Sequence, residues 1–324
     1  DAYTLYRQRG ELSGPGRVKL DDGRELTAGK IVIATGSVIN EPAVPGLAEA
    51  EKLTSDEVLE LDTLPERVIV LGGGIVACEL AQYLRRMGSE VVMIQRSPRI
   101  LKEATPEAAA VLEEVFRNEG IELYTGTHLE SIEQSGGETT VNFTHCGEPK
   151  TVRGTQLFNA LGRRPAVESL GLETAGVKTT PSGHIECNTW QQTSQPDIYA
   201  AGDCAGPHEI VHVAVMQGEI AAKHALGMRA EPVNYDQLTA AVFTDPQVAS
   251  VGLSEAAAKE RGIDCMAVDF PFDDHGKSIL MEAKHGYVKV VAERANGKVI
   301  GAECVGKDAA ELIHPLAVGV TLGS

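Results

Sequence analysis

An apolar run that breaks into three glycines and then resumes with helical spacing is the part of this sequence best suited to chemistry. The run Arg67–Leu71 is typical of a strand, Gly72 permits a tight turn, and Gly74 lets backbone N–H groups approach a pyrophosphate. The helix that follows would place the partial positive charge of its N-terminus at the same point. This pattern predicts a dinucleotide-binding turn, and the alternative is a purely structural strand-to-helix turn. The residues of the predicted turn are Gly72, Gly73, Gly74, Ile75, Val76 and Ala77.

The residues after the glycines indicate that the turn belongs to a larger unit. Gly88 is placed to end the helix, and Val91–Ile94 has the composition of the next buried strand. A complete strand, turn, helix and strand unit is therefore predicted. One face of the helix is expected to carry an apolar stripe formed by Val76, Leu80, Leu84 and Met87.

The end of the second strand bears on which nicotinamide dinucleotide would bind. An acidic residue at this point accepts hydrogen bonds from the ribose 2′-hydroxyl group and favours NAD. This chain has Gln95 and Arg96 there instead, with Arg99 a few residues on. A guanidinium group matches a 2′-phosphate and offers no acceptor for a hydroxyl group, so the sequence favours NADP over NAD. The alternative is that both arginines are solvated loop cations.

Two further strand ends carry residues suited to a second cofactor. Thr35 and Gly36 follow one apolar strand, and Gly202 and Asp203 follow another. An acidic residue just past a strand can bind a hydroxyl group of a polyol, and the helix predicted at 211–226 would stabilise negative charge at its N-terminus. Each signal is weak alone, because glycine commonly follows a strand and Asp203 could simply cap a helix.

Titratable side chains near the two predicted helix starts have both structural and chemical interpretations. His208 and His212 flank the start of the second helix, where a surface or capping role is favoured over catalysis. Glu79 lies inside the first helix and would face solvent in a simple nucleotide-binding domain. In an enzyme with two cofactors it would instead point toward the cleft between domains.

Composition and charge place the chain among ordinary globular proteins. Of its 324 residues, 43% are hydrophobic and 23% are charged. The formal net charge of -17 argues against nucleic acid or an anionic membrane as a partner, because either would need a basic face. With no transmembrane run and no recognised signal segment, a cytoplasmic location is expected. The six cysteines and nine histidines are scattered without metal-ligand spacing, so no metal site is predicted.

The order of predicted elements indicates an α/β chain that ends in an α+β segment. Residues 54–57 have the spacing of a capping box, and a helix is predicted at 106–118 before a strand-rich segment. Two strands joined through Asn296–Gly297 form the strongest hairpin, and a helix is predicted at 308–322. An antiparallel meander that ends on a buried strand is expected at the start of the chain, with strands at Tyr3–Arg7, Arg17–Leu20 and Lys30–Ala34.

Taken in order, these segments resemble the FAD-dependent pyridine nucleotide-disulfide oxidoreductases, which include dihydrolipoamide dehydrogenase, glutathione reductase and mercuric reductase. Each segment alone is modest, whereas the combination is highly specific and spans nearly the whole chain. The matching segments are Ile33–Ser37, Gly72–Glu79, Ala160–Pro165, Ile198–Asp203 and Pro246–Glu255. The resemblance implies Rossmann-type FAD and NAD(P) domains, an α+β dimerisation domain, and FAD with NADP or NAD as cofactors.

The resemblance also implies roles for individual residues. Asp203 would bind the ribitol chain of FAD, and Glu79 matches the family glutamate that pairs with a lysine beside the flavin. No residue of this chain is assigned a catalytic role, and Glu79 is named only as a flavin-side partner. The FAD site would further include Thr35, Gly36, Gly202 and the backbone N–H groups of His212, Val213 and Ala214. The nicotinamide nucleotide would be held by Gly72–Glu79, Gln95, Arg96, Arg99 and Gly162.

The sequence departs from the family pattern at both ends. The family's first G-x-G-x-x-G, its C-x-x-x-x-C redox pair and the lysine partner of Glu79 would precede Asp1, and the later His and Glu acid/base pair would follow Ser324. The chain is therefore interpreted as a fragment or a trimmed sequence. The predicted domains are residues 1–55 (C-terminal part of the FAD-binding domain), 56–165 (NAD(P)-binding domain), 166–234 (return segment of the FAD-binding domain) and 235–324 (incomplete dimerisation domain).

The leading hypothesis is a homodimeric flavoenzyme that passes electrons from NADPH or NADH through FAD to a small-molecule disulfide, dithiol or metal-thiolate substrate. Dihydrolipoamide dehydrogenase-like chemistry is the first interpretation. A mercuric reductase-like or glutathione reductase-like NADPH enzyme is the alternative, because Gln95–Ser97 leans toward NADPH-using members. A catalytically silent nucleotide-binding fragment or scaffold is a hypothesis of a different class.

Overall fold

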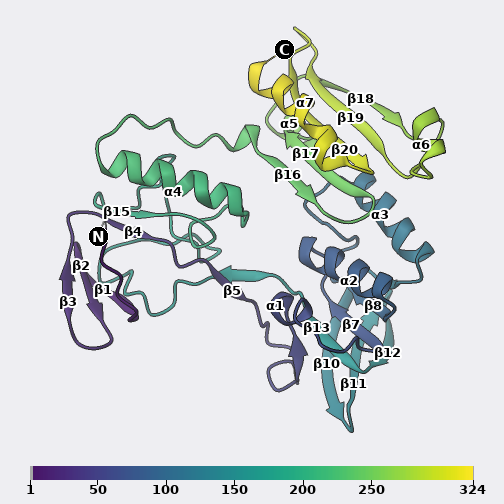
Figure 1. The fold of residues 1–324 in the computed structure, drawn as a ribbon, viewed down its shortest axis with the longest axis horizontal. Coiled ribbons are helices and arrows are strands. Elements are labelled where there is room, and N and C mark those ends of the chain that lie inside the picture. The colour runs from purple at the N-terminus through teal and green to yellow at the C-terminus, as the bar shows by residue number, and fades with distance from the viewer. Residues whose placement is uncertain (1–2, 324) are drawn as a thin grey trace. The chain divides into compact units, whose positions relative to one another are not determined.

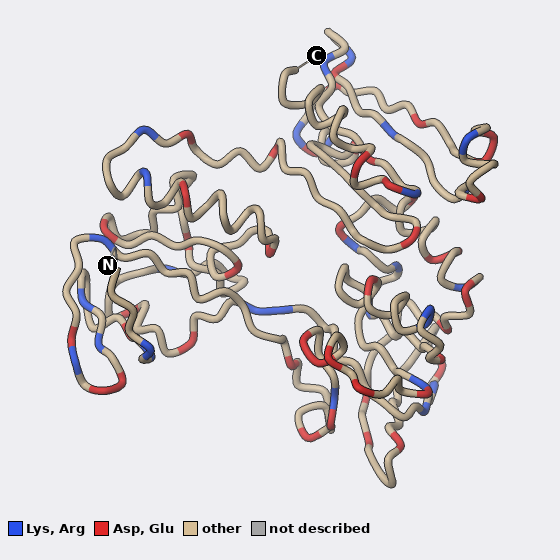
Figure 2. The backbone as a smooth tube through the Cα atoms, viewed as in Figure 1, with Lys and Arg blue, Asp and Glu red and all other residues tan. Residues whose placement is uncertain are grey.

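The computed structural model describes residues 3–323 as two compact units, each built from two separate stretches of the chain (Figure 1). The first unit contains the residues up to Asn40 together with Arg163–Asn234. The second contains Glu41–Gly162 and the residues from Tyr235 onward. The chain therefore leaves the first unit, builds part of the second, returns to the first and leaves it again. Figure 2 shows acidic and basic residues interspersed along both units.

A parallel sheet of five strands forms the centre of one part of the second unit. Its strand order is β6, β13, β7, β8, β9, and every neighbouring pair is parallel. A parallel sheet of this kind is buried on both faces, which explains why its central strands are apolar at nearly every position. The strands are β6 (Lys52–Leu53), β13 (Gln156–Asn159), β7 (Arg67–Leu71), β8 (Glu90–Ile94) and β9 (Glu122–Tyr124).

Helices cover one face of this sheet, and a small antiparallel sheet covers the other. Val68 and Val70 of β7 belong to the core cluster that contains the helices, whereas Ile69 and Leu71 belong to the cluster that contains Phe143 of the antiparallel sheet. The alternating side chains of one strand therefore supply two separate cores. The covering elements are α1 (Ser55–Val58), α2 (Ile75–Met87), α3 (Pro106–Asn118), β10 (Thr127–Ser135), β11 (Glu138–His145) and β12 (Glu148–Gly154).

Helix α2 begins and ends where the sequence predicts, but its buried face differs from the predicted stripe. Gly88 ends the helix with a φ of 120°. Val76 and Met87 are 41% and 57% exposed, so two members of the predicted stripe lie outside the core. Small side chains on the buried face let α2 approach the sheet closely. The buried residues of α2 are Ala77, Cys78, Ala81, Gln82 and Leu84.

The rest of the second unit is a five-stranded antiparallel sheet with the last helix packed on one face (Figure 1). Its strand order is β16, β17, β20, β19, β18. The predicted hairpin and final helix are confirmed as β19, β20 and α7. The elements are η1 (Tyr235–Gln237), β16 (Thr239–Val242), β17 (Gln247–Gly252), α5 (Glu255–Glu260), β18 (Cys265–Pro271), α6 (Gly276–Leu280), β19 (Tyr287–Glu293), β20 (Val299–Gly306) and α7 (Ala309–Leu322).

The first unit is built from short strands and one long helix. Two distant strands, β4 and β15, pair in parallel, and β5 pairs with β14 antiparallel. These pairings bring the chain that follows β4 beside the chain that follows β15. The elements are β1 (Gly10–Gly14), β2 (Arg17–Leu20), β3 (Glu25–Thr27), β4 (Ile31–Ile33), β5 (Ser37–Ile39), β14 (Arg163–Pro165), β15 (Ile198–Ala200) and α4 (Val211–Ala225).

The predicted N-terminal meander is wrong in two respects. Residues 3–7 form no strand, and the first strand begins at Gly10. The buried strand β4 does not join the sheet of β1, β2 and β3, because Ile33 packs in the core around Ile198 and Ala200 and pairs with β15. The α/β fold class and the capping box at residues 54–57 are confirmed.

Shortening a buried side chain of α2 should destabilise the second unit. Leu84→Ala should lower its free energy of unfolding by about 2–5 kcal/mol, because Leu84 is fully buried. Met87→Ala changes an exposed side chain of the same helix and should alter the free energy by less than about 0.5 kcal/mol. Urea unfolding followed by circular dichroism measures both, and equal losses would contradict the burial pattern of α2.

Candidate functional site

The glycine turn between β7 and α2 is packed against the end of a neighbouring strand. Gly72 is buried and has a φ of 115°, in the region that favours glycine. A Cβ atom at this position would lie 2.2 Å from the carbonyl oxygen of Ala160, which follows β13. Gly73 is also buried, and a Cβ atom there would lie 3.0 Å from Cγ of Gln95. Backbone conformation and packing both require glycine at residue 72.

The N-terminus of α2 is open to a ligand. Its N-cap, Gly74, is exposed and makes no side-chain capping hydrogen bond, and a Cβ atom there would meet nothing within 4 Å. Ile75 and Val76 are largely exposed, whereas Ala77 is buried against the sheet. The first N–H groups of a helix have no intrahelical partner, so an uncapped N-terminus suits a negatively charged phosphate group. The turn fits the pyrophosphate of a dinucleotide.

The two arginines after β8 lie in different environments. Arg96 is exposed and makes no hydrogen bond or ion pair with another described residue. Arg99 donates from Nη2 to the backbone oxygens of Lys102 and Ala104 at 2.9 and 3.4 Å, and its Nε is buried without a hydrogen-bond partner. Gln95 is half-buried and lies against Gly73 of the glycine turn. Arg96 is thus the guanidinium available to a 2′-phosphate, whereas Arg99 braces its own loop.

The carboxylate of Glu79 is half-buried and bonded to a distant segment of the second unit. Its Oε1 accepts a hydrogen bond of 2.8 Å from the backbone N–H of Phe243, which follows β16. Burial raises the pKa of Glu79, and the bond from Phe243 lowers it. Glu79 is therefore neither freely solvated nor unpaired, and its position beside a flavin stays a prediction. Sequence reasoning missed Phe243, because a backbone contact between distant segments leaves no local pattern.

In the first unit, the glycines that follow β4 and β15 both adopt positive φ. Gly36 and Gly202 have φ values of 70° and 78°. The N–H of Gly202 donates to Oε1 of Gln217 at 2.7 Å, and Nε2 of Gln217 donates to the carbonyl oxygen of Gly206 at 2.8 Å. Gln217 lies in α4 and is fully buried, so it ties the loop that carries Asp203 to the helix. Sequence reasoning did not identify it.

Asp203 belongs to a hydrogen-bonded chain of side chains. Oγ of Ser37 donates to Oδ2 of Asp203 at 2.6 Å, and Nε of Arg163 donates to Oγ of Ser37 at 2.6 Å. The other carboxylate oxygen of Asp203 makes no hydrogen bond with a described residue, which suits a ligand hydroxyl group. Thr35, two residues before Ser37, is exposed. The pKa of Glu209 is raised, first by burial and then by the charge of Asp203. Ser37 and Arg163 were not predicted as site residues.

The N-terminus of α4 packs against the same loop. A Cβ atom at Gly202 would lie 3.3 Å from Cβ of Ala214 in the first turn of the helix. The N-cap Ile210 makes no side-chain capping hydrogen bond, so its own side chain does not cap the start of this helix. His212 is exposed and Val213 is buried. The arrangement of Asp203 beside an uncapped helix N-terminus fits the polyol and the polar ring edge of a flavin.

The His, Cys, Asp and Glu side chains of residues 3–323 form no cluster with the makeup of a metal site. No three His, Cys, Asp or Glu side chains among them gather in a way that could hold a metal ion, and none of their helices is long and apolar enough to cross a membrane. All six cysteines are free, and Cys146 is exposed. Burial raises the pKa of Cys187 to about 12, which disfavours its thiolate.

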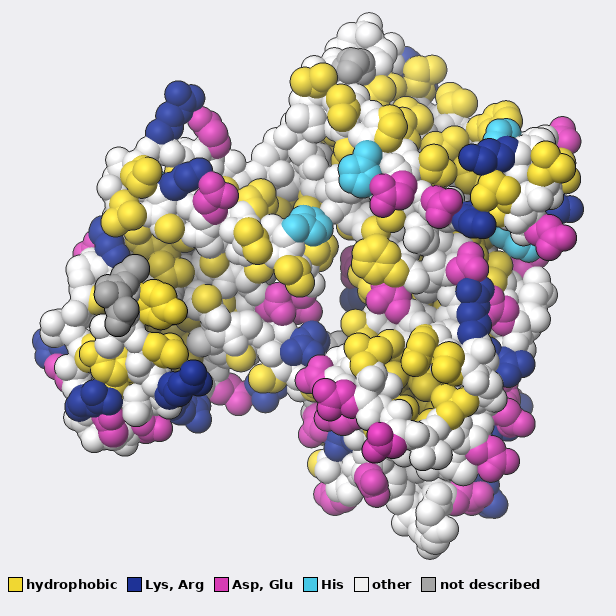
Figure 3. Space-filling model, viewed as in Figure 1, with side chains coloured by type: hydrophobic (Ala, Val, Ile, Leu, Met, Phe, Trp, Pro, Cys, Tyr) yellow, Lys and Arg dark blue, Asp and Glu magenta, His cyan; other side chains and the backbone are white. Residues whose placement is uncertain are grey.

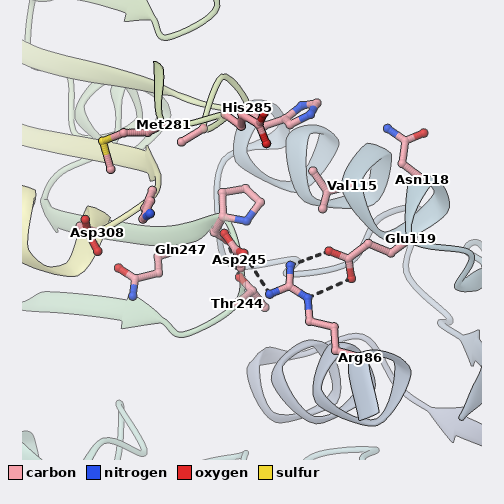
Figure 4. Close-up of a pocket in the computed structure, with 14 residues that line it drawn as sticks. Arg86, Val115, Asn118, Glu119, Thr244, Asp245, Gln247, Met281, His285 and Asp308 are labelled. Carbon is pink, nitrogen blue, oxygen red and sulfur yellow. Dashed lines mark hydrogen bonds and ion pairs between the residues drawn. The ribbon is translucent and has the colours of Figure 1, made fainter. Parts of the chain in front are cut away.

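A pocket of about 540 Å³ lies within the second unit (Figure 4). It is lined by the ends of α2 and α3, by residues 244–247, by residues 281–283 and 285, and by residues 307–308. At its edge, Arg86 donates to both Asp245 and Glu119 (Figure 4). The pocket contains none of the residues predicted to bind a cofactor.

Comparison with known proteins connects both units to one group of enzymes. Residues 2–218 match the family model described as pyridine nucleotide-disulphide oxidoreductase, and residues 238–324 match that of its dimerisation domain. A mercuric reductase of Staphylococcus aureus is 35% identical over 93% of this chain and 55% of its own length. A dihydrolipoyl dehydrogenase of Geobacillus stearothermophilus is 32% identical over 94% of this chain and 64% of its own.

A solved structure shares the fold. The crystal structure of LpdA from Mycobacterium tuberculosis has a TM-score of 0.87 and 31% identity, covering 98% of this chain and 70% of that one. The chain spans about half the length of the mercuric reductases that it matches from Staphylococcus aureus and Bacillus cereus.

The glycines of the turn should differ in their tolerance of a methyl group. Gly72→Ala should lower the free energy of unfolding by more than about 1 kcal/mol, because of its positive φ and the contact with Ala160. Gly74→Ala should cost less than about 1 kcal/mol, because Gly74 has a φ of -78° and open space around it. Thermal unfolding without ligand measures both. A greater loss for Gly74→Ala would be inconsistent with this geometry.

Proposed function

Because the chain belongs to the pyridine nucleotide-disulphide oxidoreductase family, we propose that the protein is a flavin-dependent oxidoreductase. It passes electrons from NADPH or NADH through FAD to a small-molecule disulfide, dithiol or metal-thiolate substrate. Enzymes of this family use FAD and NAD(P)H. The observation that carries the proposal is the uncapped N-terminus of α2, placed beside a turn that requires glycine and near the unpaired Arg96.

The nicotinamide nucleotide would bind in the second unit. Its pyrophosphate would accept hydrogen bonds from the N–H groups at the start of α2, over Gly74. Arg96 would pair with the 2′-phosphate of NADP. Gly162 is exposed, has a φ of 96° and has open space around it, so a nucleotide could approach its backbone. Glu79 would lie at the flavin-side end of this site. The other residues proposed for the site are those predicted from sequence, which are Gly72–Cys78, Gln95 and Arg99.

FAD would bind in the first unit. Asp203, oriented by Ser37, would accept a hydrogen bond from a ribitol hydroxyl group, while N–H groups at the start of α4 would face the flavin ring. When bound, FAD supplies a ring that accepts a hydride and gives up electrons to the second substrate. Gln217 supports this site by holding the backbone of Gly202 and Gly206 in place.

The proposed activity is dihydrolipoamide dehydrogenase-like, with a mercuric reductase-like or glutathione reductase-like NADPH enzyme as the second candidate. The exposed, unpaired Arg96 favours an NADPH-using member and is the observation behind that second candidate. Sequence identity does not separate the substrates. Relatives named mercuric reductase match at 35–36% and those named dihydrolipoyl dehydrogenase at 32–34%.

We further propose a homodimer assembled through the segment from residue 235 onward. Figure 3 shows apolar side chains gathered over α7 and the neighbouring strands. Leu312, Val318 and Leu322 of α7, with Val268 and Phe270 of β18, are each at least half exposed. Exposed apolar side chains that gather on one surface are typical of an interface.

A cytoplasmic location is proposed because the free cysteines suit a reducing compartment. The division at residues 55, 165 and 234 stays a proposal.

Flavin spectroscopy on the purified protein that carries this chain tests the proposed activity. After incubation with FAD, the protein should show a bound-flavin absorbance spectrum that bleaches when NADPH is added without oxygen, and recovers with lipoamide or another disulfide. A protein that stays colourless, with no NADPH-dependent reductase activity, would refute the proposal and favour the silent scaffold.

A charge reversal at Arg96 tests the preference for NADPH. Arg96→Glu should weaken NADPH binding by about 10- to 100-fold, because it removes a charge-assisted pair with the 2′-phosphate and adds repulsion. NADH binding should change by less than about 3-fold, because NADH has no 2′-phosphate to pair with Arg96. Calorimetric titration measures both. Arg153→Glu, an equal charge change on exposed β12, serves as control, and equal losses for the two nucleotides would refute the assignment.

Light scattering tests the proposed dimer. The protein should have twice the mass of one of its chains, and Leu312→Glu combined with Val318→Glu should yield monomers, because charges replace apolar side chains of α7. Leu59→Glu, at an exposed apolar position beside α1, should leave the dimer intact. A monodisperse monomer before any substitution would rule the dimer out.

A further inference from the structure

Three side chains on one face of α2 bond to a single loop of the antiparallel-sheet part of the second unit. Glu79, Gln82 and Arg86 are three and four residues apart, so they lie along one side of the helix. All three bond to the segment Phe243–Asp245, between β16 and β17, which we call the clamp loop. The loop is therefore attached to the helix that carries the nucleotide turn.

Gln82 makes the central contact of this set. It is 3% exposed, although glutamine is a polar residue. Its Oε1 accepts from the N–H of Asp245 at 2.8 Å, and its Nε2 donates to the carbonyl oxygen of Asp245 at 2.7 Å. Nε2 also donates to Oε1 of Glu119 at 3.1 Å. A buried amide bonded at both ends to one residue fixes the backbone of the clamp loop at that point.

Arg86 supports the same loop from the surface. Its Nη1 donates to Oδ2 of Asp245 at 2.9 Å, and its Nη2 donates to Oε1 of Glu119 at 2.6 Å. Glu119 is the C-cap of α3. Arg86 therefore connects the ends of two helices to the clamp loop, in a geometry drawn in Figure 4.

The pocket beside the clamp loop makes these bonds important for its position. Thr244, Asp245 and Pro246 line the pocket of about 540 Å³, and Oγ1 of the buried Thr244 donates to the carbonyl oxygen of Pro246 within the loop. Phe243 is 71% exposed, so its side chain does not anchor the loop. The attachment to α2 therefore adds to the contacts that set the position of the Phe243 N–H group.

We propose that Gln82 and Arg86 are positioning residues, which hold the N–H group of Phe243 against the carboxylate of Glu79 and so fix the orientation of Glu79 in the nicotinamide nucleotide site. This inference rests on the proposed function, since that function gives Glu79 its place at the flavin-side end of the site. The residues act through the clamp loop and do not themselves contact the nucleotide.

Loss of the Phe243 bond has a predictable electrostatic consequence. Burial raises the pKa of Glu79 and the Phe243 N–H lowers it, so displacement of the loop leaves burial unopposed and raises the pKa further. The neighbouring thiol of Cys78 is buried, and its own pKa is raised first by burial and then by Glu79. The charged groups of the attachment itself are Arg86, Asp245 and Glu119.

Two substitutions in the attachment and one matched control test the proposal. Gln82→Leu keeps the side-chain size and removes all three hydrogen bonds, while Arg86→Met removes the surface contact. Arg117→Met is the control, because Arg117 is an exposed arginine on α3 that pairs with Glu113 outside the attachment. The measurement is the carboxyl 13C titration of Glu79 by NMR without flavin, with its signal identified by its loss in Glu79→Gln.

The pKa of Glu79 should rise in Gln82→Leu and rise less in Arg86→Met, and it should stay unchanged in Arg117→Met. In the flavin-loaded protein, the pH profile for flavin reduction by NADPH should shift in the same direction. If Gln82 and Arg86 had a purely structural role, both variants would have a lower free energy of unfolding. The Glu79 titration and the pH profile for flavin reduction would then stay unchanged.

An unchanged Glu79 titration in both attachment variants would overturn the inference. If Gln82→Leu does not fold, Arg86→Met decides alone. The side chain of Arg86 is 46% exposed, so its replacement should not disturb the core. Glu79→Gln separates the two levels of the proposal. If Glu79→Gln reduces flavin at the normal rate while the attachment variants still shift the titration, the role of Glu79 in the proposed function fails and the positioning inference stands.

Discussion

The hydrogen bonds between α2 and the clamp loop join the two parts of the second unit. A single helix begins at the open N-cap Gly74, carries Glu79 in its middle and bonds through Gln82 to a loop between two strands of another sheet. Because a helix is stiff over its length, a constraint at its later turns also fixes its first turn. The nucleotide turn and the antiparallel sheet are therefore parts of one body, in agreement with the contacts that group them. A second junction adds to this constraint, because the buried carboxylate of Glu303 accepts a hydrogen bond from Thr105 at the start of α3.

The two candidate cofactor sites share a structural solution. In each, a parallel strand leads through a glycine of positive φ toward a helix whose N-terminus has no side-chain cap. A ligand phosphate or flavin edge needs those N–H groups, so the loops cannot be held by capping them. In α4 the buried Gln217 holds the preceding loop instead, because it bonds to the backbone of Gly202 and Gly206. The buried Gln82 of α2 bonds to the clamp loop and not to the glycine turn.

The buried glutamines of α2 and α4 are polar side chains at positions where apolar ones would be expected. Gln82 and Gln217 are 3% and 0% exposed, and burying an amide costs free energy unless its hydrogen bonds are satisfied. Both amides are bonded through oxygen and nitrogen, so the cost is offset and the geometry is specified. The sequence pattern of α2 predicted a buried face of large apolar residues. The buried face in the structure differs from it in part because it includes Gln82.

Local features were determined by the sequence itself. The glycine turn, the end of α2 at Gly88, the capping box at residues 54–57 and the hairpin through Asn296–Gly297 all depend on backbone angles and hydrogen bonds within a few residues, so residue types at fixed spacing specify them. Only the tertiary structure decided that β4 pairs with β15, that Arg96 is free while Arg99 is engaged, and that a backbone N–H group 164 residues away in sequence bonds to Glu79. These outcomes depend on which surfaces pack together, and contacts between distant segments leave no periodic or local signal in the chain.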